Sequence, residues 1–156
     1  SYGAEKFIKT CSEIGIDGMI IPDLPFEEKE EFAGPCRKHG IDLISMIAPT
    51  SEERIDTIAR EAEGFIYCVS SLGVTGTRSS ITTDLDSIVA RIRAVTDTPI
   101  AIGFGISNPE QAAAMAAKSD GAIVGSAIVK IIAAEGENAV SAVGEFARKM
   151  VEAIRA

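Results

Sequence analysis

The chain has 156 residues, 46% of them hydrophobic and 24% charged, and its 15 basic and 23 acidic side chains give a formal net charge of −8. This charge argues against nucleic acid or an anionic membrane surface as a ligand, because both require clustered Lys and Arg side chains. No apolar run reaches the roughly 18 residues of a membrane span and no signal peptide opens the chain, which together predict a soluble protein.

Short apolar runs alternate with amphipathic helical stretches along the chain. Ser1 has no initiator Met before it and a helical pattern begins within a few residues, so we expect a piece of a longer protein. Helices are predicted, in chain order, over 3–15, 26–39, 51–62, 84–96, 108–117 and 137–155. Strands are predicted between them over 18–22, 43–47, 64–69, 99–103 and 121–124, where runs rich in Ile and Val indicate burial on both faces.

Local signals mark several helix ends. Asn108 followed by Pro109 predicts a helix N-terminus, because Asn caps the first turn and Pro suits the first helical position. Gly15 and Gly40 follow helical stretches and predict left-handed C-terminal caps. The turn Ala48-Pro49-Thr50-Ser51 predicts a tight connection that ends in a capping hydroxyl.

The alternation predicts a single α/β domain over residues 1–156 with a parallel sheet and helical crossovers. Both a doubly wound sheet and part of a (β/α)₈ barrel fit this order of elements. In either architecture ligands bind at the carboxyl ends of the strands, so the loops that follow the strands are the place to look for chemistry.

Two of these loops carry candidate polar groups. Asp23, between Pro22 and Leu24-Pro25, is either a carboxylate that orients a substrate or catalytic group, or an ordinary acidic residue before a helix. The loop over 70–80 is longer than usual and has glycine on both sides of Val74-Thr75, which predicts a mobile lid or phosphate gate, with a merely solvated loop as the alternative. Tyr67 precedes that loop and is either a ligand contact or a core tyrosine with a satisfied hydroxyl.

Glycine-bearing strand ends predict a phosphate site. The fourth strand ends in Gly103-Phe104-Gly105, and the fifth leads through Gly125-Ser126 into a short helical segment. Glycines clear space for a ligand group beside exposed backbone N–H groups. Two neighbouring ends of this kind, each before a helix N-terminus, predict an anion cradle, and (β/α)₈ enzymes commonly bind phosphate after strands seven and eight.

Histidine and cysteine usage excludes several kinds of active site. His39 is the only histidine and precedes Gly40 at a predicted helix end, where contact with the helix dipole explains it. Cys11, Cys36 and Cys68 lie in periodic or apolar segments without CxxC spacing, which predicts reduced core residues and a cytoplasmic protein. With no catalytic triad or metal-ligand cluster available, catalysis must use carboxylate, Tyr or Lys side chains.

Five motifs, in this order, resemble the signatures of the tryptophan synthase alpha subunit family. They are Pro22-Asp23-Leu24-Pro25, Ala48-Pro49-Thr50, Tyr67-Cys68-Val69-Ser70-Ser71-Leu72-Gly73-Val74-Thr75-Gly76, Gly103-Phe104-Gly105-Ile106-Ser107 and Gly125-Ser126-Ala127-Ile128-Val129-Lys130. The resemblance covers essentially the whole chain. Other phosphate-binding barrels share the last two glycine sites but not the full set.

The resemblance implies a partial (β/α)₈ TIM barrel in which this chain supplies five parallel strands, barrel strands 4–8, from about the third helix onward. It implies a lyase of tryptophan biosynthesis that cleaves indole-3-glycerol phosphate by a retro-aldol reaction to indole and glyceraldehyde 3-phosphate. No cofactor is implied in this subunit. The partner beta subunit of an α₂β₂ complex carries pyridoxal phosphate and makes tryptophan from indole and serine.

The resemblance also implies roles for individual residues. The substrate phosphate is expected to lie against Gly76, Gly105, Ser107, Gly125 and Ser126. Supporting catalytic roles are expected for Thr75, which helps close the active site, for Tyr67 near the glycerol portion, and for Asp23, which supports catalytic geometry and subunit communication.

The family's two main catalytic carboxylates, a Glu at the end of the second strand and an Asp in the following loop, have no counterpart in this sequence. We therefore expect the isolated chain to be inactive, since general acid–base catalysis alone contributes about 10²–10⁴ in rate. Two other interpretations remain open: another sugar-phosphate barrel enzyme, and a non-catalytic phosphate-binding module.

Overall fold

The computed structural model describes residues 2–70, 85–103 and 105–156, apart from the Glu52 side chain. Helices and strands alternate as predicted. In chain order the regular elements are α1 (Ala4–Glu13), β1 (Gly18–Met19), α2 (Glu30–His39), β2 (Asp42–Leu43), β3 (Ser45–Ile47), α3 (Ile55–Arg60), β4 (Ile66–Val69), α4 (Leu85–Arg93), β5 (Ile100–Gly103), α5 (Pro109–Ala116), β6 (Gly121–Ile123), α6 (Ser126–Glu135) and α7 (Ala139–Arg155).

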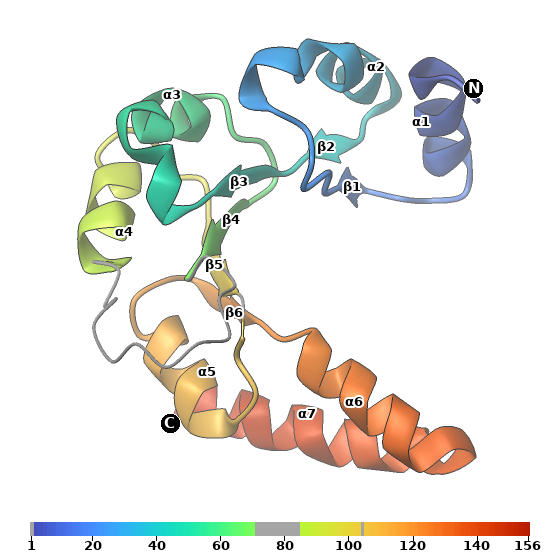
Figure 1. Cartoon of the computed structure of the whole chain (residues 1–156), viewed down its shortest axis with the longest axis vertical. Helices are drawn as coiled ribbons and strands as arrows, with labels where there is room; N and C mark the ends of the chain where they lie inside the picture. The colour runs from blue at the N-terminus through green and yellow to red at the C-terminus, as the bar shows by residue number, and fades with distance from the viewer. Residues whose placement is uncertain (1, 71–84, 104) are drawn as a thin grey trace.

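All strand pairs are parallel, as expected of a βα repeat. Four strands pair in the order β3-β4-β5-β6, and β1 pairs with β2 in a separate two-stranded sheet. The single apolar run predicted over 43–47 forms both β2 and β3, which are separated only at Ile44. The strands follow one another along an arc with helices on its outer side (Figure 1), which is the arrangement of a partial barrel.

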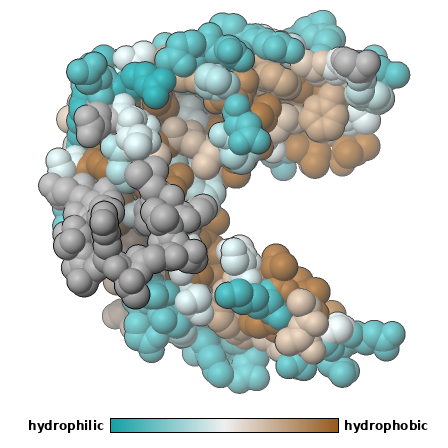
Figure 2. Space-filling model, viewed as in Figure 1, coloured by the Kyte–Doolittle hydropathy of each residue, from teal (hydrophilic) through white to brown (hydrophobic). Residues whose placement is uncertain are grey.

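The main core lies between the four-stranded sheet and helices α3 and α4. Ile66 and Cys68 of β4 and Ile100 and Ile102 of β5 point to this side and are fully buried. Residues alternate faces along a strand, so half-buried Tyr67 points to the opposite, inner side of the arc. Apolar surface lies along that inner side and on both arms of the molecule (Figure 2).

Several predicted helix ends are confirmed. The Asn108 side chain accepts a hydrogen bond from the Gln111 N–H at 2.8 Å and caps α5, and Pro109 is its first residue. Gly15 and Gly40 have φ of +85° and +68°, the left-handed conformation expected of C-terminal caps.

Two predicted helices start later than expected because a 3₁₀ turn precedes each. Phe26–Glu28 forms such a turn before α2, and Pro49–Arg54 forms one before α3. Ser51 does not cap α3. Its buried hydroxyl instead accepts the Ala48 N–H at 3.1 Å and closes the turn after β3.

The C-terminal end of the chain is built from α6 and α7. Helix α7 packs on α5 through a small cluster that includes Met150, Ile106 and Ala112. None of the ten residues of α6 is fully buried, although the helix is rich in Ile, Val and Ala. Within the described residues, every helix is too short or too polar to cross a membrane.

Candidate functional site

The glycine-bearing strand ends lie at one edge of the sheet, as predicted. Strands β5 and β6 are parallel neighbours, with Gly103 paired to Ile123 at their carboxyl ends. Gly105 and Ser107 follow β5, and Gly125 and Ser126 follow β6. The sheet therefore brings the four described residues of the predicted phosphate site to adjacent strand ends.

Gly105 and Gly125 have no close neighbour at their Cβ positions among the described residues. A Cβ atom at either position would meet no described atom within 4 Å. Gly105 has φ of +81°, so its backbone conformation itself favours glycine. Gly125 has φ of −117°, which any residue adopts, and packing against the described chain does not require a glycine there.

The two serines lie at helix N-termini. Ser126 is the first residue of α6, and Ser107 directly precedes Asn108, the N-cap of α5. Backbone N–H groups at such positions are available to anions. The Ser107 N–H and hydroxyl, however, both donate to Oε1 of Gln111, at 2.9 and 3.2 Å. Gln111 was not identified from the sequence. The available signal was its place three residues after the N-cap Asn108, where a capping box has Glu or Gln.

Gly103 has a different role from the one the sequence suggested. We expected it to clear space for a phosphate, but a Cβ atom built on Gly103 would lie 2.5 Å from the Tyr67 hydroxyl oxygen. The Tyr67 ring atoms follow at 2.8 and 2.9 Å. Because Gly103 has no side chain, it leaves room for the Tyr67 ring of the neighbouring strand β4. No described residue forms a hydrogen bond with the Tyr67 hydroxyl.

Asp23 lies apart from the residues that are predicted to bind the phosphate. It is exposed in a turn after β1, closed by a hydrogen bond from the Leu24 N–H to the Ile21 carbonyl at 3.2 Å. The strand before it belongs to the two-stranded sheet, whereas Tyr67 and the glycines belong to the four-stranded one. Thr75 and Gly76, with the predicted lid over 70–80 from position 71 onward, lie outside the described residues.

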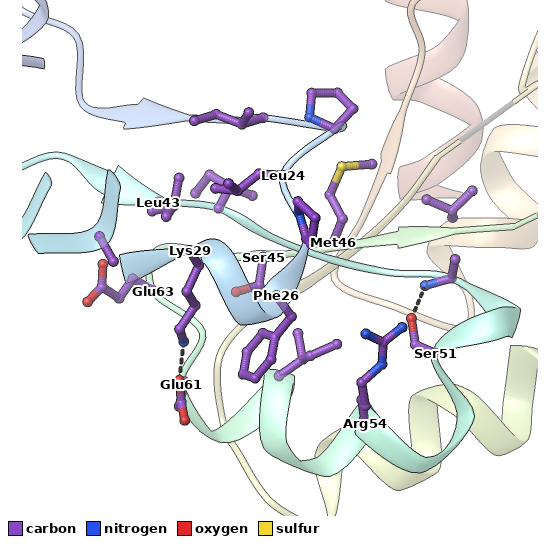
Figure 3. Close-up of a pocket in the computed structure, with 18 of the residues that line it drawn as sticks. Leu24, Phe26, Lys29, Leu43, Ser45, Met46, Ser51, Arg54, Glu61 and Glu63 are labelled. Atoms are coloured by element: carbon purple, nitrogen blue, oxygen red, sulfur yellow. Dashed lines mark hydrogen bonds and ion pairs between the residues drawn. The ribbon is translucent and has the colours of Figure 1, made fainter. Parts of the chain in front are cut away.

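A hollow of about 360 Å³ runs from the loop after β1 into the space between α2 and α3 (Figure 3). Leu24 and Met46 contribute apolar lining at the strand side. On the helix side Lys29 forms an ion pair with Glu61, and its ammonium lies 4.4 Å from the centre of the Phe26 ring. Sequence reasoning did not identify this hollow, because it is formed by elements far apart in the chain.

The surroundings of the cysteines and of the histidine indicate structural roles, as expected. Cys11, Cys36 and Cys68 are free and buried, and desolvation raises the pKa of Cys68 to about 11. His39 lies at the end of α2, and its Nε2 is 3.1 Å from a carboxylate oxygen of Glu5 on α1. Among the described residues, His, Cys, Asp and Glu side chains form no cluster that could hold a metal ion.

The chain is similar to known proteins over nearly its whole length. The family model described as "Tryptophan synthase alpha chain" matches residues 1–155. The tryptophan synthase alpha chain of Lacticaseibacillus casei is 46% identical over 155 residues, and that of Lactiplantibacillus plantarum is 49% identical over 154. These matches cover 99% and 98% of the chain but 58% of each relative, so the chain spans little more than half of their length.

Solved structures agree with the sequence matches. The tryptophan synthase alpha chain of Legionella pneumophila superposes with a TM-score of 0.82 at 34% identity, covering 99% of this chain and 58% of that one. A structure of the Pyrococcus furiosus tryptophan synthase a2b2 complex gives a TM-score of 0.82 at 31% identity, covering 96% of this chain and 61% of that one. The strand-end glycines, the parallel half-barrel and these matches lead to one conclusion: the chain belongs to the tryptophan synthase alpha chain family.

Proposed function

We propose that the protein represented by this chain cleaves indole-3-glycerol phosphate to indole and glyceraldehyde 3-phosphate. In this retro-aldol reaction the indole C3 gains a proton, the bond from C3 to the glycerol carbon breaks, and the hydroxyl on that carbon becomes the aldehyde after losing its proton. The observation that carries the proposal is the family match over residues 1–155, and the open glycine-bearing strand ends after β5 and β6 support it.

Within this proposal, each predicted site residue has a task. Gly105, Ser107, Gly125 and Ser126 hold the substrate phosphate through backbone N–H groups and the serine hydroxyls, and Gly76 borders it. Thr75 helps close the site over the substrate. Tyr67 contacts the glycerol portion with its hydroxyl, and Asp23 supports catalytic geometry from the loop after β1.

Other groups supply the acid–base catalysis and the pyridoxal phosphate chemistry. The main acid–base carboxylates belong to a part of the family's barrel that has no counterpart in these 156 residues. The partner is a tryptophan synthase beta subunit, which holds the pyridoxal phosphate, and the alpha subunit itself uses no cofactor. Such a complex is named for the similar Pyrococcus furiosus protein. The buried, free cysteines are consistent with the cytoplasm as its location.

Activity is tested first on the chain as it stands. The purified chain is incubated with indole-3-glycerol phosphate, and indole is measured after separation from the substrate. We expect no release above a blank without protein, because acid–base catalysis is worth about 10²–10⁴ in rate and its groups are missing. Steady turnover by the purified chain would refute this part of the proposal.

Phosphate binding is tested with Gly125→Asp. Glycerol 3-phosphate should bind the chain with roughly millimolar affinity, on the order of −4 kcal/mol, and shift the amide signals of Gly105 and Ser126 in ¹H–¹⁵N spectra. An aspartate at 125 has room to point into the cradle, fills the space of the phosphate and repels its charge, so binding should be abolished.

Gly144→Asp is the matched control, because Gly144 is an exposed glycine in α7 with no described atom near its Cβ position. This variant adds the same charge away from the strand ends and should bind as the unchanged chain does. Equal binding by Gly125→Asp, or unmoved Gly105 and Ser126 signals in the folded chain, would show that the phosphate site is wrongly placed.

A further inference from the structure

Gln111 occupies hydrogen-bond donors that the proposed phosphate site needs. Its Oε1 atom accepts from the Ser107 backbone N–H at 2.9 Å and from the Ser107 hydroxyl at 3.2 Å. Both groups belong to Ser107, which lies two positions after Gly105 and directly before the N-cap of α5. A phosphate oxygen placed on Ser107 would require the same two donors.

The position of Gln111 is not explained by helix capping alone. In a capping box the side chain at the third helical position bonds to the N–H of the N-cap residue. Here the N-cap is Asn108, and its own side chain already accepts the Gln111 N–H at 2.8 Å. The Gln111 side chain reaches one residue further back, to Ser107, and therefore acts on the strand-end loop rather than on the cap.

Gln111 is also free to move. The residue is exposed, so its side chain can rotate into water. The carboxamide oxygen is an uncharged acceptor, whereas a phosphate oxygen forms charge-assisted hydrogen bonds that are roughly twice as strong. A phosphate can therefore displace the carboxamide, but it must do so before it binds Ser107.

We infer that Gln111 is an internal competitor for the phosphate site, and that its carboxamide oxygen takes the place of one phosphate oxygen on Ser107 until substrate displaces it. This inference rests on the proposed function, because it concerns the same phosphate. Its consequence is a specificity filter: a dianionic phosphate monoester gains enough from the exchange to replace the carboxamide, and a neutral or weakly charged ligand does not. Gln111 is a specificity-determining residue in this scheme.

The test is a titration of the ¹⁵N-labelled chain with glycerol 3-phosphate, in the unchanged form and with Gln111→Ala and Gln111→Glu. The net value of a hydrogen bond is about 1 kcal/mol, so removing the competitor should lower Kd about fivefold in Gln111→Ala. Gln111→Glu keeps an acceptor on Ser107 and adds a negative charge, so its Kd should rise above that of the unchanged chain. The Ser107 amide signal should move in Gln111→Ala before any ligand is added.

Gln111→Met is the second variant, since it keeps the length of the side chain and suits a helix while lacking the acceptor. It should bind as Gln111→Ala does, whatever the effect of alanine on folding. A purely structural role for Gln111 would lower the melting temperature in Gln111→Ala and leave Kd unchanged or weaker. That result, with phosphate still shifting Gly105 and Ser126, would overturn the inference and leave the phosphate site standing. Absence of those shifts in every variant would overturn both.

Discussion

Three glycines at the strand ends serve three different purposes, which only the structure distinguishes. Gly103 makes room for the Tyr67 side chain, and Gly105 adopts a positive φ of +81°. Gly125 has neither a close described neighbour nor a strained backbone. The sequence motif placed glycines after β5 and β6, but it does not show which atoms lie next to each of them.

Gly103→Ala should therefore destabilise the chain. The new methyl group would lie 2.5 Å from the Tyr67 hydroxyl oxygen, so the ring must move. Overpacking of this kind costs typically about 1–3 kcal/mol in the free energy of unfolding, measured by urea denaturation. Gly125→Ala, which meets open space, is the control and should change stability by less than about 0.5 kcal/mol.

Adding Tyr67→Ala to Gly103→Ala separates the steric cause from other effects. Removal of the ring should cancel most of the cost of the methyl group, so the two changes should be strongly non-additive in a double-mutant cycle. Additive losses would show that the Gly103 Cβ position and the Tyr67 ring do not compete for the same space.

At the scale of elements, Asp120 joins three parts of the fold. It lies in the turn between α5 and β6, and its Oδ2 accepts the Ile100 N–H at the start of β5 at 2.8 Å. The same oxygen accepts from Arg93 at the end of α4 at 3.1 Å. The Ile100 backbone hydrogen bond and, secondarily, Arg93 lower the pKa of Asp120. The carboxylate thus ties the entry of two neighbouring strands to the preceding helix.

The pKa of Asp120 makes a prediction about stability and pH. A folded-state pKa below the unfolded value of about 4 means that the ionised group stabilises the fold above that value. This contribution disappears as the pH falls through the lowered pKa. Asp120→Asn should therefore lower the free energy of unfolding at pH 7, with a smaller difference from the unchanged chain at pH 2.5. Urea denaturation at both pH values checks this, and an equal difference at both would contradict it.

At the scale of the whole molecule, the buried core is concentrated in the middle of the arc. Ten buried residues form the cluster around β3, β4 and β5, and α3 and α4 cover it. The two ends have smaller buried clusters, one of four residues that includes Ile8 and one of three that includes Met150, and they also carry exposed apolar side chains such as Phe7 and Val129. In Figure 2 apolar surface lines the inner side of both arms. Stability should therefore depend on the middle far more than on the ends.

The same change, Ile to Ala, at one central and one terminal position tests how stability is distributed over the molecule. Ile92 in α4 is 0% exposed and belongs to the central cluster, so Ile92→Ala should lower the free energy of unfolding by about 2–5 kcal/mol. Ile132 in α6 is 49% exposed, and Ile132→Ala should cost less than about 1 kcal/mol. Urea denaturation of both variants gives the comparison. Losses of similar size would show that α6 is covered in solution.

The sequence by itself determined the order of the elements and the sheet edge at which the predicted phosphate-site residues lie. Runs such as 99–103, which are short, apolar and bounded by turn signals, favour buried strands, and Asn108-Pro109 favours a helix start through local geometry. Parallel pairing then follows from the helical crossovers, and it brings Gly105 and Gly125 to one edge. These features depend on neighbours in the chain, which is why the pattern of residues predicted them.

Contacts between elements were decided only by the tertiary structure. Tyr67 lies over Gly103 because β4 and β5 pair in one register, and the hollow beside Lys29 is lined by residues from elements far apart in the chain. Each of these outcomes depends on distances of a few ångströms between side chains and backbone. Composition and periodicity do not encode those distances, because many side-chain arrangements share one pattern of buried and exposed positions.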